Sequence, residues 1–180
     1  MEEIYKLEDF SLESESESEY YNRYILNKDY IILNKKACAT DYIAYNLTIY
    51  LHKKLKFTKY ISKINEYINW LNSLDCKNKL IKYFYKFNIE YFNEYGIQDI
   101  IEEYKEYASE ELDINKIICN KWYEDLEVWK AYIIIDKKGN MFSKFICEDS
   151  IFGGYSETLN FCVNENDIFE MEYEDMGDPW

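Results

Sequence analysis

The stretch that decides the fold is residues 57–74, which read FTKYISKINEYINWLNSL. Apolar side chains recur along it with i, i+3, i+4, i+7 spacing, the period of a helix that buries one face. The members of this stripe are Phe57, Tyr60, Ile61, Ile64, Tyr67, Ile68, Leu71 and Leu74. The spacing therefore predicts an amphipathic helix that packs against another layer of the fold.

Two more helices are predicted after this one. A second apolar stripe begins at Leu80 and ends at Tyr95, and Gly96 then supplies a residue suited to the left-handed conformation that commonly ends a helix. A shorter helix is expected over 98–108, where Ile100, Ile101 and Tyr104 would be buried. We expect the three helices to lie together on one side of a sheet.

Strand patterns occur on both sides of this helical region. On the amino-terminal side, residues 24–26 and 29–33 suggest a hairpin around Asn27 and Lys28, and residues 43–55 alternate with the period of a strand that buries one face. His52 falls on the polar side of that strand. On the carboxy-terminal side, strands are expected at 117–119, 128–135, 141–147, 159–163 and 168–173, with a turn over 136–140 in which Gly139 can take a positive φ.

The order of strands, grouped helices and strands indicates an α+β fold. We expect a mostly antiparallel sheet, formed by the amino-terminal and carboxy-terminal strands, packed against a central group of two to three helices. Five Gly and one Pro leave no obvious linker, so residues 20–180 are interpreted as a single domain. Residues 1–19 are interpreted as an acidic, flexible segment, because the run Glu13–Glu19 has no apolar side chain to bury. The alternative for that run is a phosphoserine cluster at Ser14, Ser16 and Ser18.

The composition also bears on the compartment. No apolar stretch approaches the ~20 residues of a membrane-spanning helix, so no membrane partner is expected. The first residues carry acids where a secretory signal would carry bases. The cysteines are widely spaced, odd in number and never in a C-x-x-C pair, which favours five reduced, buried thiols: Cys38, Cys76, Cys119, Cys147 and Cys162. Together these features predict a cytoplasmic protein.

No motif for catalysis, a metal or a cofactor is visible. His52 is the only histidine, so any nucleophile–histidine pair or common histidine-bearing zinc site would depend on it, and on a strand surface it is interpreted as structural. Gly153 and Gly154 have no accompanying Lys-Ser/Thr and are interpreted as a turn. A small-ligand protein or enzyme whose site converges only in three dimensions stays an alternative.

The net charge of −14 is segregated along the chain. Residues 1–19 hold eight acidic residues and one basic residue, whereas residues 20–86 hold thirteen basic and four acidic residues. Residues 87–144 are moderately acidic, and residues 145–180 hold ten acidic residues and no Lys or Arg. The chain therefore combines a basic stretch with strongly acidic ends.

The acids near the carboxy terminus have a pattern. Glu170, Glu172 and Glu174 alternate with apolar residues, so a strand here would place three carboxylates on one face. This row is either a solvated edge that blocks edge-to-edge pairing or a surface that meets a basic protein. The residues that we assign to partner binding are Glu170, Glu172, Glu174, Asp175, Asp178 and Trp180. If this assignment fails, the aromatic residues Trp122, Trp129 and Tyr155 are the next candidates.

The basic stretch contains a cluster of lysines where the third strand meets the first helix, namely Lys53, Lys54, Lys56, Lys59 and Lys63. Such a cluster could contact phosphates. The acidic net charge argues against that, and we expect these lysines to pair with Glu102, Glu103 and Glu106 or with an acidic tail. The sequence therefore predicts no direct contact with nucleic acid.

The layout from Tyr20 to Tyr173, the small size, the acidity and the lack of catalytic motifs resemble the immunity proteins with which bacteria neutralise contact-delivered toxins. The resemblance implies an acidic inhibitor that binds the basic surface of a protein partner. Phage-encoded inhibitors such as anti-CRISPR proteins and nucleic-acid mimics share this profile and stay an alternative. In either case long-range attraction would speed association, and buried aromatic residues would fix the affinity.

Overall fold

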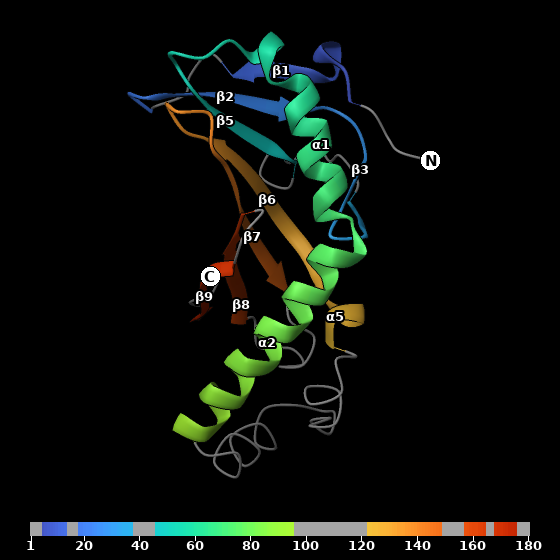
Figure 1. Ribbon diagram of the computed structural model, residues 1–180, viewed down its shortest axis with the longest axis vertical. Coiled ribbons are helices and arrows are strands. Elements are labelled where there is room, and N and C mark those ends of the chain that lie inside the picture. Colours follow the sequence, from blue (N-terminus) through green and yellow to red (C-terminus); the bar gives the residue numbers. More distant parts are fainter. Residues whose placement is uncertain are drawn as a thin grey trace, which may run out of the picture.

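The computed structural model describes residues 5–13, 18–37, 46–95, 122–148, 157–164 and 168–175 (Figure 1). Its helical elements are η1 (Leu7–Asp9), η3 (Phe57–Lys59), α1 (Ile61–Leu71), α2 (Leu74–Tyr95) and α5 (Trp122–Asp125). Its strands are β1 (Phe10–Glu13), β2 (Tyr21–Leu26), β3 (Tyr30–Ile32), β4 (Lys35–Ala37), β5 (Thr48–His52), β6 (Glu127–Ile135), β7 (Met141–Glu148), β8 (Glu157–Val163) and β9 (Ile168–Asp175).

Within these residues, seven strands form one sheet in the order β1-β2-β5-β6-β7-β8-β9. Every neighbouring pair is antiparallel except β5 and β6, which run parallel. The parallel pair arises because the helical region separates the two strands in sequence, so the chain can return to the same end of the sheet before β6 begins. The α+β prediction with a mostly antiparallel sheet is confirmed.

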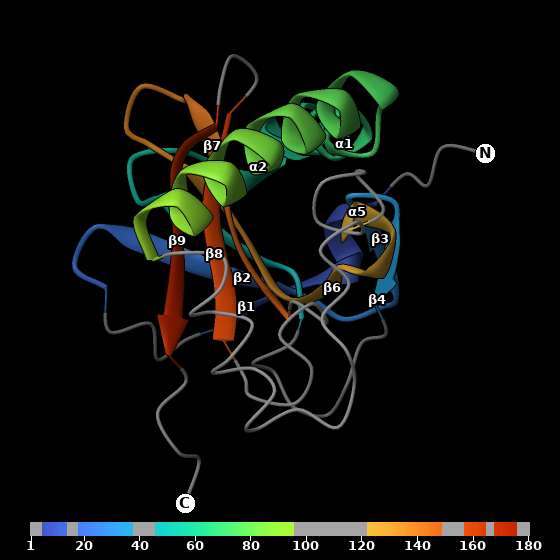
Figure 2. The same cartoon turned by 90° about the horizontal axis from the view of Figure 1, so that it is seen from below.

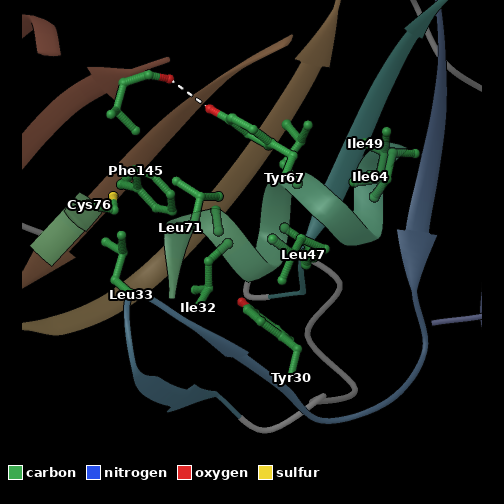
Figure 3. Packing of buried hydrophobic residues seen from close by; sticks show 14 of the residues in the cluster. Tyr30, Ile32, Leu33, Leu47, Ile49, Ile64, Tyr67, Leu71, Cys76 and Phe145 are labelled. Carbon is green, nitrogen blue, oxygen red and sulfur yellow. Dashed lines mark hydrogen bonds between the residues drawn. The ribbon is translucent and has the colours of Figure 1, made fainter. Parts of the chain in front are cut away.

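Helices α1 and α2 follow one another along one face of the sheet, as Figure 2 shows. Between the helices and the sheet lies the core, and Figure 3 shows part of it. Tyr67 of α1 and Phe84 of α2 are buried there, and the ring of Phe84 meets that of Phe161 edge to face at 5.2 Å. The strands contribute their alternate residues, among them Ile49, Leu51, Ala131, Ile133, Ile135, Phe145, Leu159, Phe161 and Val163. The apolar stripe therefore packs as its period predicted from Phe57 to Leu71, whereas its last predicted member, Leu74, begins α2 and is 71% exposed.

The predicted hairpin around Asn27 and Lys28 is wrong. Strand β2 pairs with β1 and β5 in the large sheet, whereas β3 pairs with β4 in a separate two-stranded sheet. The tight turn instead lies at Leu33 and Asn34, which both have positive φ, as the central residues of a type I′ turn do. Leu33 is buried, and its carbonyl accepts a 2.6 Å hydrogen bond from the Tyr123 hydroxyl. This tertiary support offsets the strain of a left-handed leucine, which the sequence pattern does not reveal.

The amino-terminal end also differs from the expectation. Residues 5–13 belong to the fold and are not a separate flexible segment, because Tyr5 is 2% exposed and Phe10 lies in β1 against the ring of Phe57. The alternation of apolar and polar residues did not predict β1, because the strand has only four residues, too few to show a period of two. The boundary between residues 19 and 20 is therefore not a boundary of the packed domain. Ser14 and Ser16 lie outside the described residues.

The other predicted elements fall into two groups. The turn over 136–140 and strands β6, β7, β8 and β9 are confirmed, and Gly139 has the expected positive φ of 86°. The strand predicted over 43–55 is confirmed only for Thr48–His52, since residues 53–54 form a turn and residues 43–45 lie outside the described residues. The shorter helix over 98–108, the strand over 117–119, and Gly96, Gly153 and Gly154 lie outside the described residues.

Candidate functional site

Strand β9 lies at one edge of the large sheet and brings the three alternating glutamates into register. Glu170 pairs with Cys162, Glu172 with Asn160 and Glu174 with Thr158. Residues opposite one another in an antiparallel ladder lie on the same face of the sheet. Since the next residues along β8, Leu159 and Phe161, belong to the helix-covered core, the glutamates occupy the opposite face, here called the far face. The predicted row therefore exists in the backbone.

Of the other residues predicted to bind a partner, only some lie in the described part of the chain. Asp175 is the last residue of β9 and pairs with Glu157. Asp178 and Trp180 lie outside the described residues. Of the second group of candidates, Trp129 is half-buried in β6 beside an irregularity between Val128 and Lys130.

Asn160 lies beside the glutamate row, and our sequence analysis did not single it out. It is 2% exposed, and neither its Oδ1 nor its Nδ2 has a hydrogen-bond partner among the described residues. An unsatisfied buried amide costs roughly 1–3 kcal/mol. The signal in the sequence was a single Asn inside the otherwise apolar run Leu159–Val163.

The far face carries aromatic and basic side chains farther from β9. Tyr21 and His52 pair across β2 and β5, and their rings meet edge to face at 5.6 Å. Arg23 pairs with Tyr50 in the same ladder, and its guanidinium forms a 2.6 Å ion pair with Glu13. All five of these side chains are half-buried, namely Glu13, Tyr21, Arg23, Tyr50 and His52.

Tyr132 of β6 lies on the same face, next to Tyr50. Its ring lies 5.9 Å from that of Tyr50, centroid to centroid. Burial raises the pKa of Tyr132, Tyr50 raises it further, and the nearby Arg23 acts in the opposite direction. The phenol therefore stays neutral at physiological pH and can serve as a hydrogen-bond donor.

His52 has contacts that fit a structural side chain. Its Nδ1 accepts a 3.2 Å hydrogen bond from the backbone N–H of Lys54, and its ring meets Tyr21. Within the part of the chain that the structure describes, no group of three or more His, Cys, Asp or Glu side chains could hold a metal ion. The structural role of His52 stays a prediction.

Three of the five cysteines are described, and Cys76, Cys147 and Cys162 are all buried and outside any disulfide. Burial raises the pKa of Cys76 to about 12, with a smaller contribution from Asp75 in the same direction. Because the thiolate is the reactive form, this thiol is unreactive at neutral pH. Cys38 and Cys119 lie outside the described residues.

The lysines at the start of the helical region are exposed. None of Lys53, Lys54, Lys56, Lys59 and Lys63 forms an ion pair with another described residue. Their expected partners Glu102, Glu103 and Glu106 lie outside the described residues, so that pairing stays a prediction.

No protein-family model, curated protein or solved structure matches this chain. Among the helices that the structure describes, none is both long and apolar enough to cross a membrane.

Proposed function

We propose that this chain is an acidic protein-binding inhibitor of the immunity type, which neutralises a toxin by covering a basic surface of that toxin. The glutamate row of β9 is the proposed contact surface. The observation that carries the proposal is the register of β9, which puts Glu170, Glu172 and Glu174 on one face of an edge strand.

The spacing of the row supports a protein partner. Alternate residues of a strand lie about 6.8 Å apart, so a facing strand with Lys or Arg at every second position would meet the three carboxylates with the same repeat. Within the described residues, β9 pairs only with β8, and an edge strand offers backbone N–H and C=O groups along its outer side. A basic partner could therefore combine charge pairing with backbone hydrogen bonds.

Acidic residues close in sequence strengthen the negative electrostatic potential around the glutamate row. Residues 145–180 contain ten acidic residues and no Lys or Arg, so β8 and β9 carry no basic residue. On the same face, Lys144 of β7 pairs with Cys162, the partner of Glu170, and is thus two strands away from the row. Attraction of this kind acts mainly on the association rate and is screened by salt. A nucleic-acid enzyme is an equally suitable partner by this chemistry, because its substrate-binding surface is basic.

The test compares the wild-type chain with the triple variant Glu170→Gln, Glu172→Gln, Glu174→Gln as bait in affinity capture from the source cells, with quantitative mass spectrometry. A matched control, Glu8→Gln, Glu66→Gln, Glu124→Gln, removes the same charge from three exposed positions elsewhere. We expect one partner that the wild type and the control retain and the β9 variant loses. Equal capture by all three baits would contradict the proposal.

The captured partner then allows two direct measurements. Surface plasmon resonance at low and high salt should show slower association and a flatter salt dependence for the β9 variant. The partner's own enzymatic or toxic activity should fall when the wild-type chain is added. A partner that binds without losing activity would exclude inhibition.

A further inference from the structure

Seven exposed lysines from separate parts of the sequence belong to one end of the sheet. Five of them follow β5, and two lie in the turn between β6 and β7. We call this group the lysine corner, and it consists of Lys53, Lys54, Lys56, Lys59, Lys63, Lys137 and Lys138. In Figures 1 and 2 the connection after β5 and the turn after β6 lie at the same end of the sheet.

A close contact between Gly139 and Tyr60 joins the two parts. A Cβ atom built on Gly139 would lie 2.6 Å from the hydroxyl oxygen of Tyr60, so the β6–β7 turn packs directly against the start of α1. The ammonium group of Lys63 lies 5.5 Å from the centre of the Tyr60 ring. Tyr60 therefore contacts both the turn that holds Lys137 and Lys138 and the ammonium group of Lys63.

The positive charge of the corner is not cancelled by carboxylates in contact with it. Among the described residues, none of the seven lysines forms an ion pair. Asp136 in the same turn contributes one negative charge, and its carboxylate accepts hydrogen bonds from the backbone N–H groups of Lys138 and Asn140 rather than pairing with an ammonium group. Glu66 accepts a hydrogen bond from Ser62. The ammonium group of Lys53 donates a 2.8 Å hydrogen bond to the carbonyl of Ser18, which leaves its charge in place. The positive charge of the corner can therefore attract an external anion.

Aromatic rings adjoin the corner. The backbone N–H of Lys53 donates to the carbonyl of Tyr20 at 2.9 Å, and the side chain of Tyr20 is 60% exposed. The next residue, Tyr21, lies on the far face, where its ring meets that of His52 edge to face. A chain of phosphates on the lysines would thus have rings beside it on which bases can stack.

We propose that the lysine corner and Tyr20 form a binding surface for single-stranded nucleic acid. Lysines supply point charges for successive phosphates, and exposed tyrosines supply stacking surfaces for unpaired bases. A lipid surface fits less well, because Tyr20 is the one large hydrophobic residue at the corner among the described exposed ones. An acidic peptide would use the charges but not the ring.

The net charge of −14 does not prevent this contact. Strand β9 lies four positions from β5 in the sheet, which corresponds to about 19 Å at roughly 4.8 Å per position. The Debye length in physiological salt is about 8 Å, so the glutamate row is largely screened from the five lysines that follow β5. Screening is weaker for Lys137 and Lys138, because their turn leads into β7, two positions or about 10 Å from β9. A nucleic-acid contact at this corner departs from the sequence-based expectation of no direct contact with nucleic acid. It is independent of the proposed function, because the lysine corner and the glutamate row are different surfaces.

Fluorescence anisotropy with a labelled oligo-dT of about 15 nucleotides tests the proposal. If all seven lysines each neutralise one phosphate, the slope of log K against log salt should be about −5, and affinity should fall roughly a thousandfold between about 50 and 200 mM salt. The double variant Lys59→Gln, Lys138→Gln should reduce the magnitude of that slope by about 1.4 and weaken binding between roughly tenfold and a hundredfold at low salt.

Two further variants test whether binding depends on the position of the lysines and on the ring of Tyr20. Lys82→Gln, Lys86→Gln removes the same charge from exposed positions of α2 and should leave binding nearly unchanged. Tyr20→Ala should weaken binding of oligo-dT about tenfold while leaving weak binding of a duplex unaffected. Circular dichroism melting curves confirm that each variant is folded.

Three results would overturn the inference. The first is no change in anisotropy with oligo-dT at low salt. The second is an equal loss of affinity in the corner variant and the α2 control. The third is that duplex DNA or phosphatidylserine vesicles bind at least as tightly as oligo-dT and Tyr20→Ala has no effect, which would assign the corner to a general polyanion or lipid surface.

Discussion

The side-chain amide of Asn65 holds both backbone polar groups of Tyr5. Asn65 Oδ1 accepts a 2.7 Å hydrogen bond from the backbone N–H of Tyr5, and Asn65 Nδ2 donates to the carbonyl of Tyr5 at 2.9 Å. The two residues are sixty positions apart, and both are buried. This pair attaches the amino-terminal segment to α1.

The first prediction follows from that pair. Asn65→Ala should lower the free energy of unfolding by about 1–3 kcal/mol, because it removes both hydrogen bonds from the side-chain amide to the buried backbone of Tyr5. The melting temperature should fall by about 2–4 °C for each kcal/mol. Asn69→Ala on the same helix is the control, since its side chain makes no hydrogen bond among the described residues. Equal effects of the two changes would show that helix propensity, and not the attachment of Tyr5, is being measured.

Truncation tests the same segment more strongly. Deleting residues 1–13 removes the buried rings of Tyr5 and Phe10, each of which contributes roughly 1.5–3 kcal/mol by burial. We expect the melting temperature to drop by about 10 °C or more. An unchanged melting curve would mean that the segment is dispensable, as the sequence alone suggested.

A second prediction concerns Tyr67, which links α1 to two strands. Its hydroxyl donates to the carbonyl of Val163 at 2.9 Å (Figure 3) and accepts a 3.2 Å hydrogen bond from Ser143. Tyr67→Phe leaves both groups buried and unpaired, so it should destabilise the protein by about 1–3 kcal/mol in urea unfolding. Tyr85→Phe, on an exposed ring of α2, should change stability by less than about 0.5 kcal/mol.

The third prediction separates two costs at Gly139. Gly139→Ala should destabilise the protein by more than the roughly 1–2 kcal/mol of a left-handed alanine, because its Cβ would also meet the Tyr60 hydroxyl. In a Tyr60→Phe background that oxygen is absent, and the same change should cost less. The comparison is a double-mutant cycle measured by thermal unfolding. An identical loss of stability in both backgrounds would show that the left-handed backbone conformation alone causes the loss and that the Tyr60 hydroxyl does not contribute.

The fourth prediction concerns Asn160. Asn160→Val removes the two unsatisfied amide atoms and suits a strand, so it should raise stability by about 1–3 kcal/mol. Asn160→Asp, with nearly the same shape, should be strongly destabilising because it buries a charge. Calorimetric melting curves of both variants check this. A lower melting temperature for Asn160→Val would mean that the amide is hydrogen-bonded in solution.

Local patterns predicted those features that depend on neighbouring residues. The stripe of α1, the turn with Gly139 and the alternating glutamates of β9 are all confirmed in the backbone. Each follows from a fixed period or a required backbone angle, and such properties are encoded within a few residues.

Strand partners and the grouping of distant side chains were decided by the tertiary structure. The segments around Leu26 and Tyr30 have strand-like sequences, yet β2 pairs with β5 and β3 pairs with β4. Likewise Lys137 lies at the same end of the sheet as Lys59 because β5 and β6 are parallel neighbours that end together, which lets the β6–β7 turn pack on Tyr60. The period of a strand specifies which face it buries but not which strand lies beside it, because pairing depends on contacts between residues far apart in the chain.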